Sequence, residues 1–226
     1  MNEAGTKQRL PVTTVMVNFN TPDLTQGAVT SFRHFYPDIN LILIDNGSSD
    51  NSITTLYRLQ QQHPDNTEVI KHSRNLHHGP AMDAGVRNAT THYVMFLDSD
   101  CEVTTGGFIE PMLTSLESDP MNYAVGKKIF MNRRGFDVDD EKNGIPYIRP
   151  FCMMLKRELY FLPPPFRRHG SPCLANMRTA TQRGYRLIDF PVEQFVKHEG
   201  RGTAGPFGYN LGFRGKLNYL LNKMGI

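Results

Sequence analysis

The chain has 226 residues and a mass of 25.7 kDa, and it is 39% hydrophobic and 21% charged, which suits one domain with a single large core. The balance of 25 Lys and Arg against 22 Asp and Glu is too even to indicate nucleic-acid binding. The three cysteines are widely spaced and no apolar run is long enough to span a membrane, which excludes a disulfide framework and a transmembrane protein. We therefore expect a soluble cytoplasmic protein that binds no nucleic acid.

The first half of the chain alternates short apolar runs with amphipathic segments, a pattern typical of βα units around a parallel sheet. We expect strands at residues 12–18, 41–45, 68–72 and 93–97, and helices at 24–35, 52–62 and 80–89. After residue 100 we expect a helix at 108–118, strands at 123–130 and 145–155, a helix at 174–183, and short strands at 185–189 and 195–198. The predicted fold is α/β, a single domain with a mostly parallel central sheet flanked by helices.

The segment 200–226 contains several Lys and Arg residues and no acidic residue. Four apolar residues within 216–224 recur at helical spacing, which predicts a short amphipathic helix. The simpler interpretation is a terminal helix packed on the domain. The alternative is a basic surface that makes a peripheral contact with the inner face of a membrane or with a lipid-linked acceptor.

Polar residues directly follow three of the predicted strands, and the carboxyl ends of parallel strands meet at one edge of a sheet. The clusters are Asn18–Asn20, the segment that begins at Asp45, and Asp98–Asp100. Two carboxylates at the end of a buried strand repel each other unless a cation or protons relieve them. Asp98 and Asp100 are therefore predicted to bind a divalent cation rather than only to cap local structure.

Other residues near these strand ends have both a structural and a functional interpretation. Asp45 either forms a turn that starts the next helix or accepts a ring N–H of a nucleobase, and spacing alone does not decide between them. Gly79 precedes a helix start, where backbone N–H groups favour an anion such as a diphosphate. His77 and His78 could ligate a metal, but adjacent histidines point in different directions, so they are interpreted as ordinary loop residues. Cys101 is expected to be a buried thiol, because no neighbouring cation would lower its pKa.

Four motifs follow one another in the first half of the chain: V-M-V-N-F-N, I-D-N-G-S-S-D-N-S, N-L-H-H-G-P-A-M-D-A-G-V-R-N-A and H-Y-V-M-F-L-D-S-D. In this order they resemble the nucleotide-sugar-dependent glycosyltransferases of the GT-A fold, of the large family-two type. The resemblance is strong over residues 12–103 and weak beyond them. It implies a nucleotide-binding half at 12–103, an acceptor half at 104–199, and the basic loop and helix at 200–226.

The resemblance also implies the ligands of the site. The implied nucleotide-binding residues are Asn18, Phe19, Asn20, Asp45, Gly79, Asp83, Asp98, Ser99 and Arg201. Asp98 and Asp100, with His198 as a third ligand, would hold Mn²⁺ or Mg²⁺ on the donor diphosphate, where the cation stabilises the leaving group. Asp45 would accept from uracil, which favours a UDP-sugar as donor. The implied acceptor is a hydroxyl of a glycan, a lipid-linked compound or a small molecule.

The chain departs from this family at the position of the general base. Inverting members commonly carry G-E-D there, but residues 169–173 read H-G-S-P-C, although the later G-Y-R motif is present at 184–186. His169 would be the base, or Glu193 or another carboxylate would reach the site, or the enzyme would retain configuration and need no base. We favour an inverting enzyme with His169 and Asp100 as catalytic residues.

Two other functions are compatible with a similar sheet. A sugar nucleotidyltransferase needs a basic glycine-rich loop after the first strand, and N-F-N-T-P-D-L-T-Q-G lacks one. A non-catalytic nucleotide-sugar-binding module is supported only by the missing G-E-D motif. The metal-binding residues instead predict a metal-dependent glycosyltransferase, because a binding module has less need to stabilise a leaving group.

Overall fold

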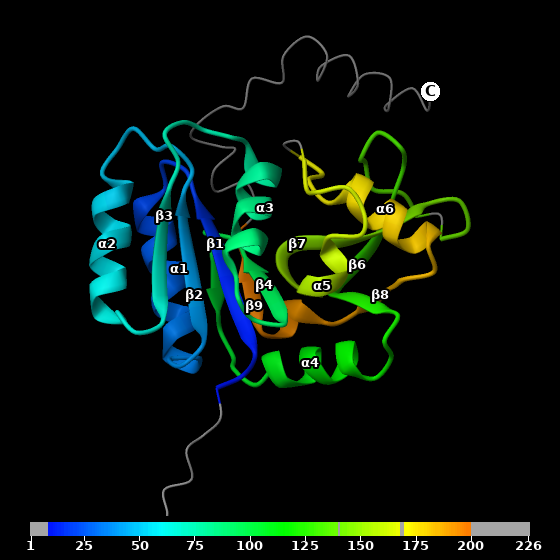
Figure 1. Ribbon diagram of the computed structural model, residues 1–226, viewed down its shortest axis with the longest axis horizontal. Helices are drawn as coiled ribbons and strands as arrows, with labels where there is room; N and C mark the ends of the chain where they lie inside the picture. Colours follow the sequence, from blue (N-terminus) through cyan, green and yellow to red (C-terminus); the bar gives the residue numbers. More distant parts are fainter. Residues whose placement is uncertain (1–8, 140, 168–169, 200–226) are drawn as a thin grey trace, which may run out of the picture.

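The computed structural model describes residues 9–139, 141–167 and 170–199 (Figure 1). The strands are β1 (Val12–Asn18), β2 (Asn40–Asp45), β3 (Thr67–Lys71), β4 (Tyr93–Leu97), β5 (Cys101–Val103), β6 (Asn122–Met131), β7 (Ile145–Lys156), β8 (Arg186–Asp189) and β9 (Val196–His198). The helices are α1 (Pro22–Phe35), α2 (Ser52–Gln62), α3 (His78–Asn88), α4 (Ile109–Glu117), α5 (Arg157–Tyr160) and α6 (Leu174–Gln182), with a 3₁₀ turn, η1, at Val192–Gln194.

The main sheet has seven strands in the order β3-β2-β1-β4-β7-β6-β8. Strands β3, β2, β1 and β4 are mutually parallel, and β6 is parallel to β8. Strand β7 is antiparallel to both of its neighbours, β4 and β6. The expected mostly parallel α/β sheet is therefore confirmed, with one reversed strand in its second half.

Helices cover both faces of this sheet and close a hydrophobic core on each side. Helices α1, α2 and α4 contribute Phe32, Leu56 and Met112 to one core. Helices α3 and α6 contribute Met82 and Met177 to the other. Alternate residues of β2 and β4 enter opposite cores, which explains why these two strands are continuously apolar rather than alternating.

A second, two-stranded sheet forms where β5 pairs with β9 in antiparallel orientation. Strand β9 was expected from the sequence, but β5, α5 and η1 were not. Each of these three is a segment of three or four residues, too short to show a hydrophobic period. The β5–β9 pair is important for the site because it brings the end of the described chain beside the end of β4.

The other expected elements are present with small shifts at their ends. Helix α1 begins at Pro22, two residues earlier than expected, and α3 also begins two residues earlier, at His78. Pro22 suits the first turn of α1, because backbone N–H groups in a first helical turn have no acceptor within the helix and proline has no N–H to leave unpaired. The predicted helix within 216–224, Arg201 and His169 all lie outside the described residues. In the described part, no helix combines the length and apolar character needed to cross a membrane.

Candidate active site

The ends of β1 and β2 are joined by a buried hydrogen bond between Asn18 and Asp45. These residues are direct neighbours in the parallel register, and Nδ2 of Asn18 donates to Oδ1 of Asp45 at 3.2 Å. The same Nδ2 lies 3.1 Å from Oγ of Ser48, and Oδ1 of Asn18 accepts from the hydroxyl of Thr25 at 2.8 Å. The structure thus brings the first two predicted clusters together at the carboxyl edge of the sheet.

The second oxygen of Asp45, Oδ2, has no hydrogen-bond partner among the described residues, although it is buried. A buried carboxylate oxygen without a donor is costly. The turn before α2 is instead made by Asp50, whose Oδ1 accepts from the backbone N–H of Ser52 at 2.9 Å. Asp45 is therefore not the residue that caps this helix, and its Oδ2 has the chemistry of an acceptor for a ligand N–H.

The loops that follow β1 and β2 also hold each other through Asn20. This residue has a positive φ of 53°, and its Oδ1 accepts from the backbone N–H of Ser49 at 2.8 Å. Its own backbone N–H donates to Oγ of Ser48 at 3.0 Å. Phe19, between Asn18 and Asn20, is half-buried. The expected nucleotide-binding segment 18–20 is thus fixed in position by the second loop.

Asn46 is a structural member of the site that the sequence analysis did not single out. Its Oδ1 accepts from the backbone N–H of Leu76 and lies 3.1 Å from Nδ1 of His72. Its Nδ2 donates to Oδ1 of Asn75 at 3.1 Å. Asn46 thereby fastens the segment before α3 to the end of β2. The I-D-N-G motif contains this residue, but a local motif does not show partners about 30 positions away.

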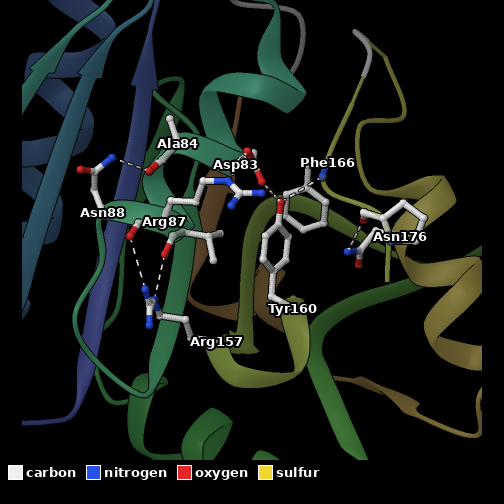
Figure 2. Close-up of polar contacts among 10 residues, drawn as sticks. Asp83, Ala84, Arg87, Asn88, Arg157, Tyr160, Phe166 and Asn176 are labelled. Carbon is white, nitrogen blue, oxygen red and sulfur yellow. Dashed lines mark hydrogen bonds and ion pairs between the residues drawn. The ribbon is translucent and has the colours of Figure 1, made fainter. Parts of the chain in front are cut away.

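Gly79 and Asp83 on α3 make contacts within the protein. A Cβ on Gly79 would lie 2.6 Å from the carbonyl carbon of Arg167, so only glycine permits this close approach. Oδ1 of Asp83 accepts from the hydroxyl of Tyr160 at 2.6 Å, and its Oδ2 accepts from Nε of Arg87 at 2.8 Å (Figure 2). These contacts give both residues a structural role, and their assignment to the nucleotide stays a prediction.

Asp98 follows β4 and lies beside the first residue of α3. Nε2 of His78 is 3.6 Å from Oδ1 of Asp98. Burial raises the pKa of Asp98, and the nearby charge of Asp100 acts in the same direction, while His78 and His198 oppose it. The adjacent Ser99 is buried. His78, interpreted from the sequence as an ordinary loop residue, is therefore part of the carboxylate cluster.

Asp100 and His198 are two side chains at this edge that could ligate a metal, and they contact each other directly. Nε2 of His198 is 3.2 Å from Oδ1 of Asp100, and this hydrogen bond raises the pKa of His198. The backbone explains the proximity, because His198 is the register partner of Cys101 and the N–H of Glu199 donates to the carbonyl of Asp100 at 3.1 Å. Two residues far apart in sequence thus meet, and their role as ligands of one cation, which the family resemblance implies, stays a prediction.

Cys101 completes the group spatially, with its sulfur and the ligand atoms of Asp100 and His198 within 4.8 Å of one another. Burial raises the pKa of the Cys101 thiol far above its ordinary value, so the sulfur stays protonated. Its Sγ lies 3.5 Å from the carbonyl oxygen of Phe151. The prediction of a buried thiol is confirmed. The donor set that fits a divalent cation is therefore carboxylate oxygen and imidazole nitrogen.

A cavity of about 780 Å³ opens between α1 and β5, and Asp100 and Glu199 lie among its walls. Asn18 and Asp45 do not line it. Glu193, an alternative candidate for the base, lies on η1 and pairs with Nζ of Lys127 at 3.0 Å. The cavity therefore provides open space beside the candidate metal ligand Asp100.

Comparison with known proteins places this arrangement in context. The family model for glycosyl transferase family 2 matches residues 13–162. An uncharacterized glycosyltransferase of Nostoc sp. is 33% identical over 92 residues, which are 40% of this chain and 28% of the relative. The poly-beta-1,6-N-acetyl-D-glucosamine synthase of Staphylococcus epidermidis is 29% identical over 83 residues, 36% of this chain and 20% of that protein. The chain thus spans less than a third of the length of these relatives.

Solved structures show the same fold. The mannosyltransferase PcManGT from Pyrobaculum calidifontis, in complex with GDP-Man and Mn²⁺, superposes with a TM-score of 0.66 at 20% identity, over 82% of this chain and 56% of that one. Residues 1–349 of TarS from S. aureus give a TM-score of 0.58 at 12% identity, over 83% of this chain and 60% of that one. At these identities the likeness establishes the GT-A architecture.

Proposed function

This chain belongs to glycosyl transferase family 2, and from that premise we propose that it transfers a sugar from a nucleoside-diphosphate sugar to an acceptor hydroxyl with the help of a divalent cation. The observation that carries the proposal is the contact between Asp100 and His198 at the edge that also holds Asn18 and Asp45. Metal-dependent transfer from a nucleotide sugar requires a site for the base and a site for the cation close together. Asn18 and Asp45 would supply the first, and Asp100 and His198 the second. The proposed domain organisation is a nucleotide-binding half at 12–103 and an acceptor half at 104–199.

Asp45 is the proposed acceptor for a ring N–H of the donor base. Its unpartnered Oδ2 supports this role, and Asn18 holds the other oxygen in place. Uracil offers such an N–H at N3, and guanine offers one at N1. A UDP-sugar remains the proposed donor. The mannosyltransferase from Pyrobaculum calidifontis was solved with GDP-Man, so GDP-sugars belong in the first test.

Asp100 and His198 are the proposed cation ligands, and Asp98 is the third. When bound, the cation would supply Lewis-acid stabilisation of the negative charge on the departing diphosphate. The carboxylates suit Mg²⁺ or Mn²⁺, and the imidazole nitrogen of His198 adds a ligand that the oxygen-preferring Mg²⁺ takes less readily. The chain itself contributes orientation, because the ring of His198 stacks on Phe151 with centroids 4.8 Å apart.

The proposed reaction inverts the anomeric centre. His169 is the candidate base that would take the proton of the acceptor hydroxyl. Glu193 is the alternative candidate base among the described residues, and its carboxylate forms an ion pair with Lys127. Replacement of His169 by Ala is expected to reduce turnover strongly while leaving nucleotide affinity unchanged, and the anomer of the product, determined by NMR, distinguishes inversion from retention.

The first experiment is a calorimetric titration of UDP, GDP, TDP and CDP with and without Mn²⁺. Wild type is expected to bind one nucleotide in a Mn²⁺-dependent manner, and Asp100→Asn is expected to lose that dependence. Asp139→Asn is the matched control, because Asp139 ends a second D-x-D triplet in an exposed loop. If the folded wild type binds none of the four nucleotides, the transferase proposal fails. Metal-dependent binding without turnover would favour a binding module.

A further inference from the structure

Three arginines converge on a pocket in the second half of the chain. The pocket has a volume of about 290 Å³, and Arg133, Arg167 and Arg178 lie in its walls. Ser171 and apolar residues such as Leu174 and Ile145 complete the lining, and no acidic residue is among its described lining. The three arginines are themselves exposed, so an anion in solution can reach their guanidinium groups. The pocket therefore combines positive charge with a defined shape.

Among the described residues, none of these three guanidinium groups has an ion pair or a side-chain hydrogen bond, whereas several other surface arginines do. Arg186, for example, lies 2.7 Å from a carboxylate oxygen of Asp119, and Arg149 pairs with Asp137. Three positive groups around one cavity repel each other unless an anion is present. This arrangement is the reverse of an ordinary surface, where Arg and Lys are interspersed with acids.

Hydrogen bonds hold the two loops that form the pocket. Between the loops, Oγ of Ser171 donates to the carbonyl of Gly135 at 3.0 Å, and within the loop before α6 the N–H of Arg167 donates to the carbonyl of Pro172 at 3.1 Å. Gly135 has a φ of 86°, and a Cβ there would lie 2.6 Å from Oγ of Ser171. The loop that carries Arg133 is thus seated closely on the loop before α6, as their neighbouring ribbons in Figure 1 show.

The pocket lies at the same edge of the sheet as the candidate active site. Because β7 is antiparallel to β4, its first residues extend past the end of β4, and Met131 at the end of β6 pairs with Ile145 at the start of β7. The backbone of Arg167 contacts Gly79, the residue after His78. Three groups therefore follow one another along this edge of the sheet. Asn18 and Asp45 lie at the ends of β1 and β2, the two carboxylates of the D-S-D motif follow β4, and the arginine pocket lies beside β6 and β7.

We propose that this pocket binds a phosphate group carried by the acceptor. The pocket lies on the opposite side of the carboxylates from Asn18 and Asp45, which is where an acceptor would approach a donor bound at those two residues. That the phosphate belongs to an acceptor rests on the proposed function. A phosphate monoester carries nearly two negative charges and accepts paired hydrogen bonds from planar guanidinium groups. A carboxylate carries only one negative charge and would leave more of the positive charge of this pocket uncompensated than a phosphate does.

The test is a titration with glycerol phosphate in EDTA, followed by NMR signals of arginine Nε–H groups. Wild type is expected to bind, and the double variant Arg133→Gln/Arg178→Gln is expected to bind at least about tenfold more weakly. Arg58→Gln, on the outer surface of α2, removes the same charge as a control and is expected to bind as wild type does. Equal weakening by the control, no binding by wild type, or acetate binding as tightly as glycerol phosphate would each overturn the proposal.

Two further arms separate this inference from the proposed function and identify the source of the phosphate. The double variant is expected to keep Mn²⁺-dependent nucleotide binding, and its loss would assign the arginines to the donor site and overturn the proposal. If wild type binds glycerol phosphate through these arginines but binds no nucleotide, the transferase function fails and the phosphate site stands. Arginine-dependent binding to phosphatidic acid vesicles would indicate a lipid-borne phosphate, and binding of glycerol phosphate alone a soluble one.

Discussion

The imidazole of His198 stacks on the ring of Phe151, with centroids 4.8 Å and planes 5° apart. Phe151 belongs to β7 of the main sheet, whereas His198 ends β9 of the small sheet. The stacking therefore fixes the ring of His198 against the main sheet while its Nε2 faces Asp100 at 3.2 Å. An imidazole held in this way is ready to bind a cation with little loss of side-chain freedom.

This geometry predicts that Mn²⁺ affinity rises with pH. The hydrogen bond to Asp100 raises the pKa of His198 above its ordinary value of about 6.5, and the proton must leave before Nε2 can bind a metal. In the metal-free protein, folding stability changes with pH in the opposite direction to Mn²⁺ affinity. The contact between His198 and Asp100 stabilises the fold at pH values below the ordinary pKa of histidine, and this stabilisation is lost as pH rises through the raised pKa of His198.

The measurement is the Mn²⁺ dissociation constant across a pH series, followed by electron paramagnetic resonance. We expect His198→Gln to remove most of the pH dependence. His92→Gln, an exposed histidine before β4, serves as the control and should keep it. An unchanged pH dependence in His198→Gln would show that another group controls metal binding.

The burial of Asp98 predicts that replacing this residue by Asn stabilises the metal-free protein. Burial raises the pKa of Asp98, so the folded state disfavours the charged carboxylate relative to the unfolded chain. Any contribution of this group to stability is present below the unfolded pKa of about 3.9 and is lost as pH rises through the raised pKa. At neutral pH in EDTA, Asp98→Asn is therefore expected to raise the melting temperature, by about 2 to 4 °C for each kcal/mol.

Calorimetry of Asp98→Asn at neutral and acid pH tests this expectation. The gain should disappear at a pH where the carboxyl is protonated in both states. Asp139→Asn, at an exposed position, should leave the melting temperature unchanged. A lower melting temperature for Asp98→Asn at neutral pH would mean that attraction to His78, 3.6 Å away, outweighs the cost of burial.

Most of the sheet could be predicted from the sequence because its central strands are buried on both faces. Residues 41–44 and 93–97 are continuous apolar runs, each followed directly by a carboxylate, and the structure has β2 and β4 at these places. In parallel strands those ends share an edge, which is how the neighbourhood of Asn18 and Asp45 could be expected before any contact was known.

Contacts between distant segments could not be predicted in the same way. Strand β5 has three residues, and nothing local indicates that Cys101 pairs with His198. The place of His198 beside Asp100 was expected from the family resemblance rather than from spacing. The arginine pocket was not predicted, because Arg133 and Arg178 come from segments that meet only through tertiary packing.

Asp45 predicts a change in base preference on substitution. In Asp45→Asn, the side-chain oxygen can still accept from Asn18, but an NH₂ group replaces the unpartnered Oδ2. Bases that offer a ring N–H, uracil and guanine, would then face a donor. Cytosine presents an acceptor at N3, which the new NH₂ group suits.

Affinity for UDP or GDP is therefore expected to fall about tenfold or more in Asp45→Asn, while affinity for CDP does not fall. Titration calorimetry with the three nucleotides and Mn²⁺ measures this ratio. Asp50→Asn alters the turn before α2 without touching Asp45, and it should leave the ratio unchanged. Equal losses for all three nucleotides in Asp45→Asn would indicate damage to the fold rather than altered base recognition.

Tyr160 predicts a large loss of stability from the removal of one hydroxyl. Its OH donates to Asp83 at 2.6 Å and accepts from the backbone N–H of Phe166 at 3.0 Å (Figure 2). Tyr160→Phe leaves that buried N–H without a partner, which costs about 1 to 3 kcal/mol. The free energy of unfolding in urea measures the effect. Tyr57→Phe, whose ring is 47% exposed, is the control and should change little, since its hydroxyl is accessible to water. Equal unfolding free energies for the two variants would show that the hydrogen bonds of Tyr160 with Asp83 and Phe166 do not stabilise the contact between α3 and the loop before α6.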